Sequence, residues 1–320
     1  MAIGTRGVGR RAPALSAYLN RHAAAGSLGP FTTGEEVMCL PGTAEAVRER
    51  IEEEGAPTVT RGTLLAGGAA AAAAAMFPGA AFGGGRGSGG PSRRFRRMQD
   101  LTHLFRAGFP VFGGPEPTRE TFFDFPTDGF YSQRWTFTEH SGTHMDAPGH
   151  FVPGGRLTPA IEADELMRPL VVVDIRRKAA SDPNAMVTVD DLRRFERGRG
   201  RIPRKAIVAM NSGWDAKVNN SLAFKGAPAF PYNFPGFSGE ATEWLIENRD
   251  VAGIAVDTLS LDPGNSTTFD AHFAILGADR YGLENVANLG EVPARGATVV
   301  VGVVPWEQGS GGPLRAFALW

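Results

Sequence analysis

Three histidines and one aspartate fall within eleven residues, and this segment restricts the fold more than any other feature of the 320-residue chain. It reads His140-Ser-Gly-Thr-His144-Met-Asp146-Ala-Pro-Gly-His150. In a fully extended chain the Cα atoms of His140 and His144 would lie roughly 13 Å apart, so their side chains could not converge on one small ion. We therefore expect a curled loop rather than a strand. The curl is expected at Gly142, because glycine adopts backbone angles that are closed to other residues.

Imidazole and carboxylate groups together favour a divalent cation such as zinc or manganese. Cys39 is the only cysteine, so the chain can form neither an intrachain disulfide nor a thiolate cage. His140, His144 and Asp146 are the first candidate ligands, and Asp146 could bind one ion or bridge two. His150 is a candidate catalytic base, because a catalytic metal needs an acid or base close to its water. A structural metal site or a packed histidine cluster is the alternative interpretation.

One loop rarely completes a metal site, so further ligands are expected downstream. His272 is the only other histidine in the C-terminal half, and it follows the turn-rich segment 262–270. Glu284 lies twelve residues later. Spacing alone makes this pairing weak, because glutamates are common.

The charge balance argues against some partners. Lys and Arg number 33 and Asp and Glu number 34, which gives a net charge of -1. We expect no nucleic-acid partner, because such partners need a basic surplus or a basic stripe. The uncharged run 64–82 is weakly hydrophobic and broken by glycine and proline, which argues against a stable membrane span. No membrane contact is expected for the mature domain.

Residues 1–97 differ in composition from the rest of the chain. A helix is expected over 45–54, and residues 38–82 resemble a degenerate export signal of the twin-arginine type, with only Arg61 where two arginines should stand. Met38 would then be the true start. Residues 83–97 predict a Gly/Arg linker. The alternative is a disordered Ala/Gly tail on a cytoplasmic enzyme. The catalytic domain is expected to span 98–320.

Strands and helices are mixed in residues 98–320, which predicts a single α/β or α+β domain with a central sheet. Apolar patterns predict strands at Gln133–Thr138, Leu170–Ile175, Ala206–Met210, Gly253–Val256 and Thr298–Val304. Helices are predicted over Asp190–Arg197 and Gly239–Asn248, the second with Ser238 as its N-cap. The chain lacks a G-x-S-x-G elbow, which counts against a serine hydrolase.

The segment His140–His150 resembles the H-x-G-T-H-x-D-x-P-x-H signature of the cyclase family, which includes bacterial kynurenine formamidases and isatin hydrolases. The resemblance extends from Asp100-Leu-Thr-His103 through 253–262 to 309–315 and covers essentially all of residues 98–320. It implies a swivelling β/β/α domain with a central sheet or barrel-like core. It also implies a homodimer or a larger homo-oligomer.

The resemblance also implies roles for individual residues. His272 and Glu284 would complete a second site with Asp146 as the bridge, although some members hold one metal, often manganese. His150 would be the catalytic base. The metal ligands that the resemblance implies are His140, His144, Asp146, His272 and Glu284.

The implied activity is metal-dependent hydrolysis of an amide-type C–N bond by activated water. The substrate would be N-formylkynurenine or a cyclic amide such as isatin, as for an arylformamidase. The alternatives are a cyclase or dehydratase, a lactone hydrolase of secondary metabolism, and a metal-binding protein without turnover.

Aromatic residues are candidates to line an aromatic-friendly substrate pocket, with ordinary loop packing as the alternative. Asp257 could contact a metal ligand without binding the metal itself, or it could cap a turn. His103 is expected at the surface or in the core. The candidate pocket residues are Trp135, Trp214, Phe224, Phe230, Tyr232, Phe234 and Phe237.

Overall fold

The computed structural model describes residues 95–320. The expected helix at 45–54, the export-like segment and most of the linker lie outside these residues. The chain divides into two compact units, and the segment 124–130 belongs to a different unit from its flanking residues. This segment forms the single-turn helix α4 (Phe125–Asp128), in which the Asp124 side chain caps the Thr127 amide. The remaining description concerns residues 95–123 and 131–320.

Seven strands form a closed barrel. The sheet closes because β4 (His144–Asp146) pairs with β10 (Tyr281–Glu284) on one side and with residues 311–313 of β12 (Gly311–Leu319) on the other. β1 (Met98–Asp100) pairs with the far end of β12. In sheet order the barrel strands are β12 (Gly311–Leu319), β11 (Arg295–Val303), β5 (Met167–Asp174), β7 (Ile207–Asn211), β9 (Gly253–Val256), β10 (Tyr281–Glu284) and β4 (His144–Asp146).

Apolar residues on both faces of the central strands explain this architecture. β5, β7, β9 and β10 are parallel neighbours. In β5, Leu170 and Val172 join one hydrophobic cluster, whereas Val171 and Val173 join a second cluster with residues of the outer helices. Successive side chains of a strand point to opposite faces, so a continuous apolar run fills both the barrel interior and the layer beneath the helices. The predicted α/β class with a barrel-like core is confirmed.

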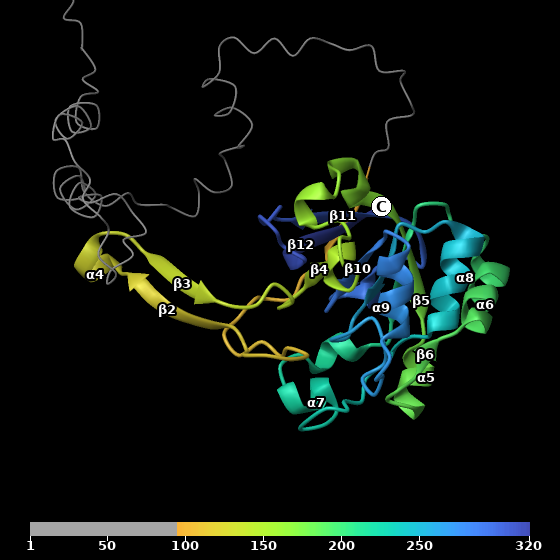
Figure 1. The fold of residues 1–320 in the computed structure, drawn as a ribbon, viewed down its shortest axis with the longest axis horizontal. Helices are drawn as coiled ribbons and strands as arrows, with labels where there is room; N and C mark the ends of the chain where they lie inside the picture. The colour runs from red at the N-terminus through yellow and green to blue at the C-terminus, as the bar shows by residue number, and fades with distance from the viewer. Residues whose placement is uncertain (1–94) are drawn as a thin grey trace, which may run out of the picture. The chain divides into compact units, whose positions relative to one another are not determined.

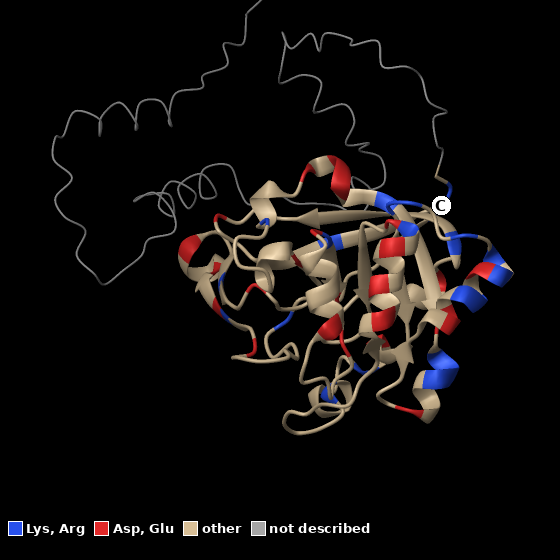
Figure 2. Ribbon diagram, turned by 45° about the vertical axis from the view of Figure 1, so that its right-hand side comes forward, with Lys and Arg blue, Asp and Glu red and all other residues tan. Residues whose placement is uncertain are grey.

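Helices cover the outer face of the parallel strands (Figure 1). Ser238 caps the amide of Ala241 at the start of α8, as predicted. Acidic and basic residues are mixed on α6, whereas α8 carries mainly acidic residues (Figure 2). Arg249 of α8 pairs with Glu196 of α6. The helices are α5 (Arg176–Ser181), α6 (Val189–Arg199), α7 (Ser221–Lys225), α8 (Gly239–Arg249) and α9 (Asp270–Gly277).

Single 3-10 turns and two small sheets complete the described chain. The strand predicted at 133–138 is found as β3, but it pairs in a hairpin with β2 and is not a barrel strand. In the described range no helix is long and apolar enough to cross a membrane. The 3-10 turns are η1 (Pro148–His150), η2 (Thr158–Ala160), η3 (Ala163–Leu166), η4 (Trp214–Lys217) and η5 (Leu289–Glu291). The small sheets pair β2 (Thr118–Phe123) with β3 (Ser132–Thr136) and β6 (Met186–Val187) with β8 (Gly236–Phe237).

Candidate metal centre

The histidine-rich segment combines a curl with a short strand. Gly142 has a φ of +67°, and a Cβ atom at this position would lie 2.5 Å from the Phe105 ring. The curl predicted between His140 and His144 is therefore present. The prediction that the whole segment is a loop is wrong, because residues 144–146 form strand β4. A strand places side chains i and i+2 on one face, so His144 and Asp146 point the same way without further curling.

Hydrogen bonds hold the curl against the neighbouring loop. The Thr143 hydroxyl donates to the Asn285 carbonyl at 2.6 Å and accepts from the His103 amide at 2.9 Å. The Asn285 side-chain amide donates to the Gly142 carbonyl at 2.9 Å. His103 thus supports the curl through its backbone. Hydrogen bonds to residues 103 and 285 therefore fix the position of this loop.

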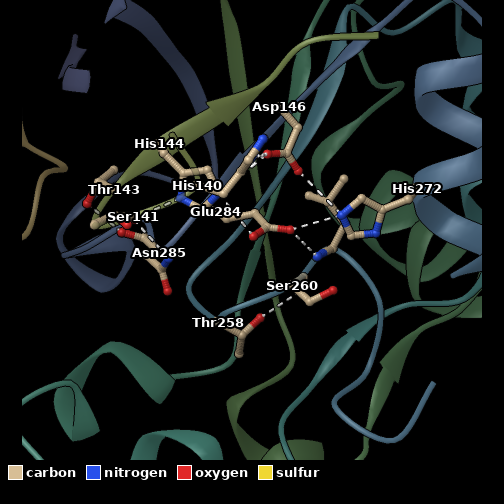
Figure 3. A network of polar contacts seen from close by, with 12 residues as sticks. His140, Ser141, Thr143, His144, Asp146, Thr258, Ser260, His272, Glu284 and Asn285 are labelled. Carbon is tan, nitrogen blue, oxygen red and sulfur yellow. Dashed lines mark hydrogen bonds and ion pairs between the residues drawn. The ribbon is translucent and has the colours of Figure 1, made fainter. Parts of the chain in front are cut away.

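Strand pairing and one helix bring the remaining predicted ligands to β4. Glu284 stands opposite His144 in the register of β10 and β4, and His272 projects from α9 (Figure 3). His144 Nε2 lies 3.4 Å from Asp146 Oδ1 and 3.3 Å from Glu284 Oε2. His272 Nε2 lies 3.3 Å from Asp146 Oδ2 and 3.2 Å from Glu284 Oε1. Each of the two carboxylates therefore lies within ion-pair distance of both imidazoles.

His140 and His150 flank this ring of four side chains. His140 Nδ1 lies 2.7 Å from Asp146 Oδ1. The His150 ring stacks on the His140 ring with centroids 3.7 Å apart and planes inclined by 24°. All five predicted ligands are thus in one cluster, and the predicted base lies against it.

The two imidazoles of the inner ring are held in a defined orientation. His144 Nδ1–H donates to the Gly142 carbonyl at 2.9 Å. His272 Nδ1–H donates to Asp262 at 2.6 Å, and the same carboxylate accepts the amides of Ala271 and His272 at the start of α9. Both rings therefore turn Nε2 towards the carboxylates, an orientation common among metal-binding histidines. The sequence reasoning missed this role of Asp262, although its place in the 253–262 motif was a signal.

The cluster concentrates negative charge in a buried place. Asp146 and Glu284 are 1% and 5% exposed, and among the described residues their ion-pair partners are histidines alone. Burial acts to lower the pKa of His144, but the two carboxylates within ion-pair distance of Nε2 outweigh burial and raise this pKa to about 10. Burial acts to raise the pKa of Asp146, but its imidazole partners hold it well below the usual range. Two buried carboxylates thus attract positive charge.

A divalent cation fits this arrangement. His144 Nε2 and Asp146 Oδ2 are buried and lack a hydrogen-bond partner, which is costly unless a further group satisfies them. Two sets of potential ligand atoms each lie within 4.8 Å of one another: His144, Asp146 and Glu284, and His140, Asp146 and His150. Asp146 belongs to both sets, as a bridging ligand would. Nitrogen and oxygen donors of this kind suit zinc or manganese.

The cluster forms one wall of a cavity of about 350 Å³. Phe112, Phe151 and Phe269 line it, and the Phe151 ring stacks on His272 with centroids 4.6 Å apart. The aromatic residues predicted for the pocket are not among its lining residues, which corrects that prediction. Phe224, Phe234 and Phe237 are fully buried because they pack in the core. Tyr232 packs edge-on against the ring of Phe112, with centroids 5.4 Å apart.

Asp257 does not contact the cluster. It is fully buried and accepts hydrogen bonds from the amides of Ser212 and Trp214, in the turn after β7. The turn-capping alternative is therefore the one that the structure supports.

Comparisons with known proteins indicate the family of this chain. The family model Cyclase, described as "Putative cyclase", matches residues 99–263. Isatin hydrolase of Roseibium aggregatum is 31% identical over 206 residues, covering 61% of this chain and 78% of that protein. Kynurenine formamidase of Erythrobacter litoralis is 28% identical over 205 residues, covering 62% and 82%. The structure of isatin hydrolase A from Labrenzia aggregata bound to benzyl benzoate has a TM-score of 0.66 at 31% identity, covering 70% of this chain and 93% of that chain. The chain therefore belongs to the cyclase family.

Proposed function

We propose that this protein is a metal-dependent hydrolase that cleaves an amide-type C–N bond in an aromatic substrate. The observation that carries the proposal is the buried ring of two carboxylates and two imidazoles at the wall of an aromatic cavity. The relatives named isatin hydrolase and kynurenine formamidase support N-formylkynurenine or a cyclic amide such as isatin as the substrate.

The proposed ligands bind one or two zinc or manganese ions through His140, His144, Asp146, His272 and Glu284. A divalent cation held there supplies Lewis acidity, which lowers the pKa of water towards about 7 and polarises a carbonyl group. The cavity dimensions suit a single aromatic ring with its acyl group, because sites of about 300–1,000 Å³ hold small ligands. The phenylalanine wall excludes water and orients the aromatic ring next to the cluster.

His150 performs the proton transfer in this proposal. Burial lowers the pKa of His150 to about 4, so its imidazole is neutral at pH 7 and can accept a proton. The oxygen of water forms a bond to the carbonyl carbon, and His150 takes the proton that the water loses. The C–N bond then breaks, and His150 returns that proton to the leaving nitrogen. An N-formyl aryl amine gives formate and the free amine, whereas a cyclic amide gives one ring-opened amino acid.

The test is turnover by the purified protein on N-formylkynurenine, on isatin and on an aryl lactone, each with and without a chelator. We expect chelator-sensitive hydrolysis of at least one of the two amides in preference to the lactone. Faster lactone hydrolysis would contradict amide specificity and favour the lactone hydrolase. Metal binding without turnover of any acyl substrate would contradict the hydrolase proposal.

A further inference from the structure

His140 differs from the other two imidazoles in the partner behind its ring. His140 Nε2 lies 3.1 Å from the Ser310 hydroxyl, on the side away from Asp146. The Ser310 hydroxyl lies 2.6 Å from Glu139 Oε2, and the Ser310 amide donates to the same oxygen at 2.9 Å. A continuous path of hydrogen bonds thus connects Glu139 with His140.

The chemistry of these groups fixes the direction of each hydrogen bond. An ionised carboxylate only accepts hydrogen bonds, and a hydroxyl has a single hydrogen to donate. The hydroxyl hydrogen of Ser310 therefore goes to Glu139, and the oxygen of Ser310 accepts from His140 Nε2–H. A neutral imidazole with hydrogen on Nε2 has its lone pair on Nδ1. His140 Nδ1 lies 2.7 Å from Asp146 Oδ1, so in a ring protonated on both nitrogens Nδ1–H donates to this carboxylate. A bound metal would replace that hydrogen and leave the Nδ1 lone pair as its ligand.

We propose that Glu139 and Ser310 are positioning residues that fix the tautomer of His140 and present its Nδ1 to the metal beside Asp146. This inference rests on the proposed function, because it takes His140 as a ligand. His140 would then bind through Nδ1, whereas His144 and His272 would bind through Nε2, since their Nδ1 atoms are already engaged. One cluster would therefore use two kinds of imidazole coordination.

The backbone around Ser310 holds this arrangement in place. Ser310 precedes strand β12, and its carbonyl accepts the Ala147 amide at 2.9 Å, next to the pairing of Gly311 with Asp146. A Cβ atom at Gly311 would lie 2.5 Å from His140 Cε1, so only glycine leaves room for the ring. The strand that closes the barrel therefore also orients one ligand.

The test is a zinc competition titration of the full chain against a chromogenic chelator. Loss of a group that orients a metal ligand weakens metal affinity by about 10–100-fold. We expect that loss in Ser310→Ala and in Glu139→Ala, and near-normal affinity in Ser310→Thr, which keeps the hydroxyl. In the Ser310→Ala background, Glu139→Ala should add little, because the path is already broken. Ser181→Ala, on exposed α5, is the matched control and should bind zinc normally.

A second measurement separates positioning from a general loss of structure. In the zinc-loaded wild type, ¹⁵N spectra of the histidine rings should show the His140 hydrogen on Nε2 and zinc on Nδ1. A hydrogen on Nδ1 would overturn the proposal, and so would normal zinc affinity of a folded Ser310→Ala variant. Fully additive losses in the double variant would also overturn it. A wild type that binds no zinc at either site would instead overturn the proposed function itself.

Discussion

Replacing Asp257 with asparagine should make the stability of the fold less dependent on pH. Burial raises the pKa of Asp257 from 3.8 to about 7, because a charged carboxylate is disfavoured away from water. Its Oδ2 accepts the amides of Ser212 and Trp214, and its Oδ1 lies 2.6 Å from the Ser212 hydroxyl. Asparagine can keep all three contacts, with its oxygen accepting both amides and its NH₂ donating to the hydroxyl.

The size of the effect follows from the two pKa values. Because the folded pKa lies above the unfolded one, the folded protein binds this proton more tightly than the unfolded chain. The resulting stabilisation is complete below pH 3.8 and is lost as the pH rises through 7. The difference between 7 and 3.8 is about 3 pKa units, which corresponds to about 4 kcal/mol at about 1.4 kcal/mol per unit. An asparagine side chain at this position carries no charge and should lose none of this stability.

Urea unfolding between pH 4 and pH 8 measures the difference between Asp257→Asn and the wild type, so that titrations common to both cancel. The free energies of unfolding should be similar at pH 4, and by pH 8 the variant should be more stable by up to about 4 kcal/mol. Asp164→Asn, at an exposed position, is the matched control and should show a much smaller change with pH. A difference that stays constant with pH, or a variant less stable than the wild type at pH 8, would refute the reasoning.

Three further substitutions test the site. His150→Gln should keep its metal but lose about 10²–10⁴-fold in kcat, as expected for a lost general base, and full activity would contradict that role. Gly142→Ala should destabilise the fold by about 1–3 kcal/mol, measured by urea unfolding, because alanine is strained at a φ of +67° and its Cβ would meet the Phe105 ring. Phe112→Ala should lower kcat/KM for aromatic amides by about 2–10-fold, through loss of ring contacts, and an unchanged value would remove this side chain from the substrate pocket.

Local patterns predicted the strands and helices better than the pairings between them. The apolar run Gly253–Val256 coincides with β9, and Ser238 starts α8 as its side chain indicated. Strand β4 was missed because three residues are too few to show a period, and its pairing partners lie more than a hundred residues away. The closure of the barrel by β4 and β12 depends on such distant pairing, which local patterns do not contain.

The candidate site likewise combines residues that local spacing indicates with residues that only distant pairing brings together. The ligands within 140–150 could be proposed from their spacing, but Glu284 meets His144 only through the register of β10 and β4. The family resemblance, rather than spacing, indicated this residue and His272. The pocket prediction failed because aromatic content does not distinguish lining residues from packed ones. The actual lining rings, Phe112, Phe151 and Phe269, come from three separate segments.

Metal stoichiometry measured on the purified full chain tests the central claim most directly. Metal-free protein is loaded with zinc or manganese, dialysed and analysed for bound metal, in parallel with an Asp146→Ala variant. Because Asp146 belongs to both sets of candidate ligands, we predict one or two tightly held ions per chain in the wild type and none in the variant. A wild type that retains no ion, or a variant that retains the same number, would contradict the account.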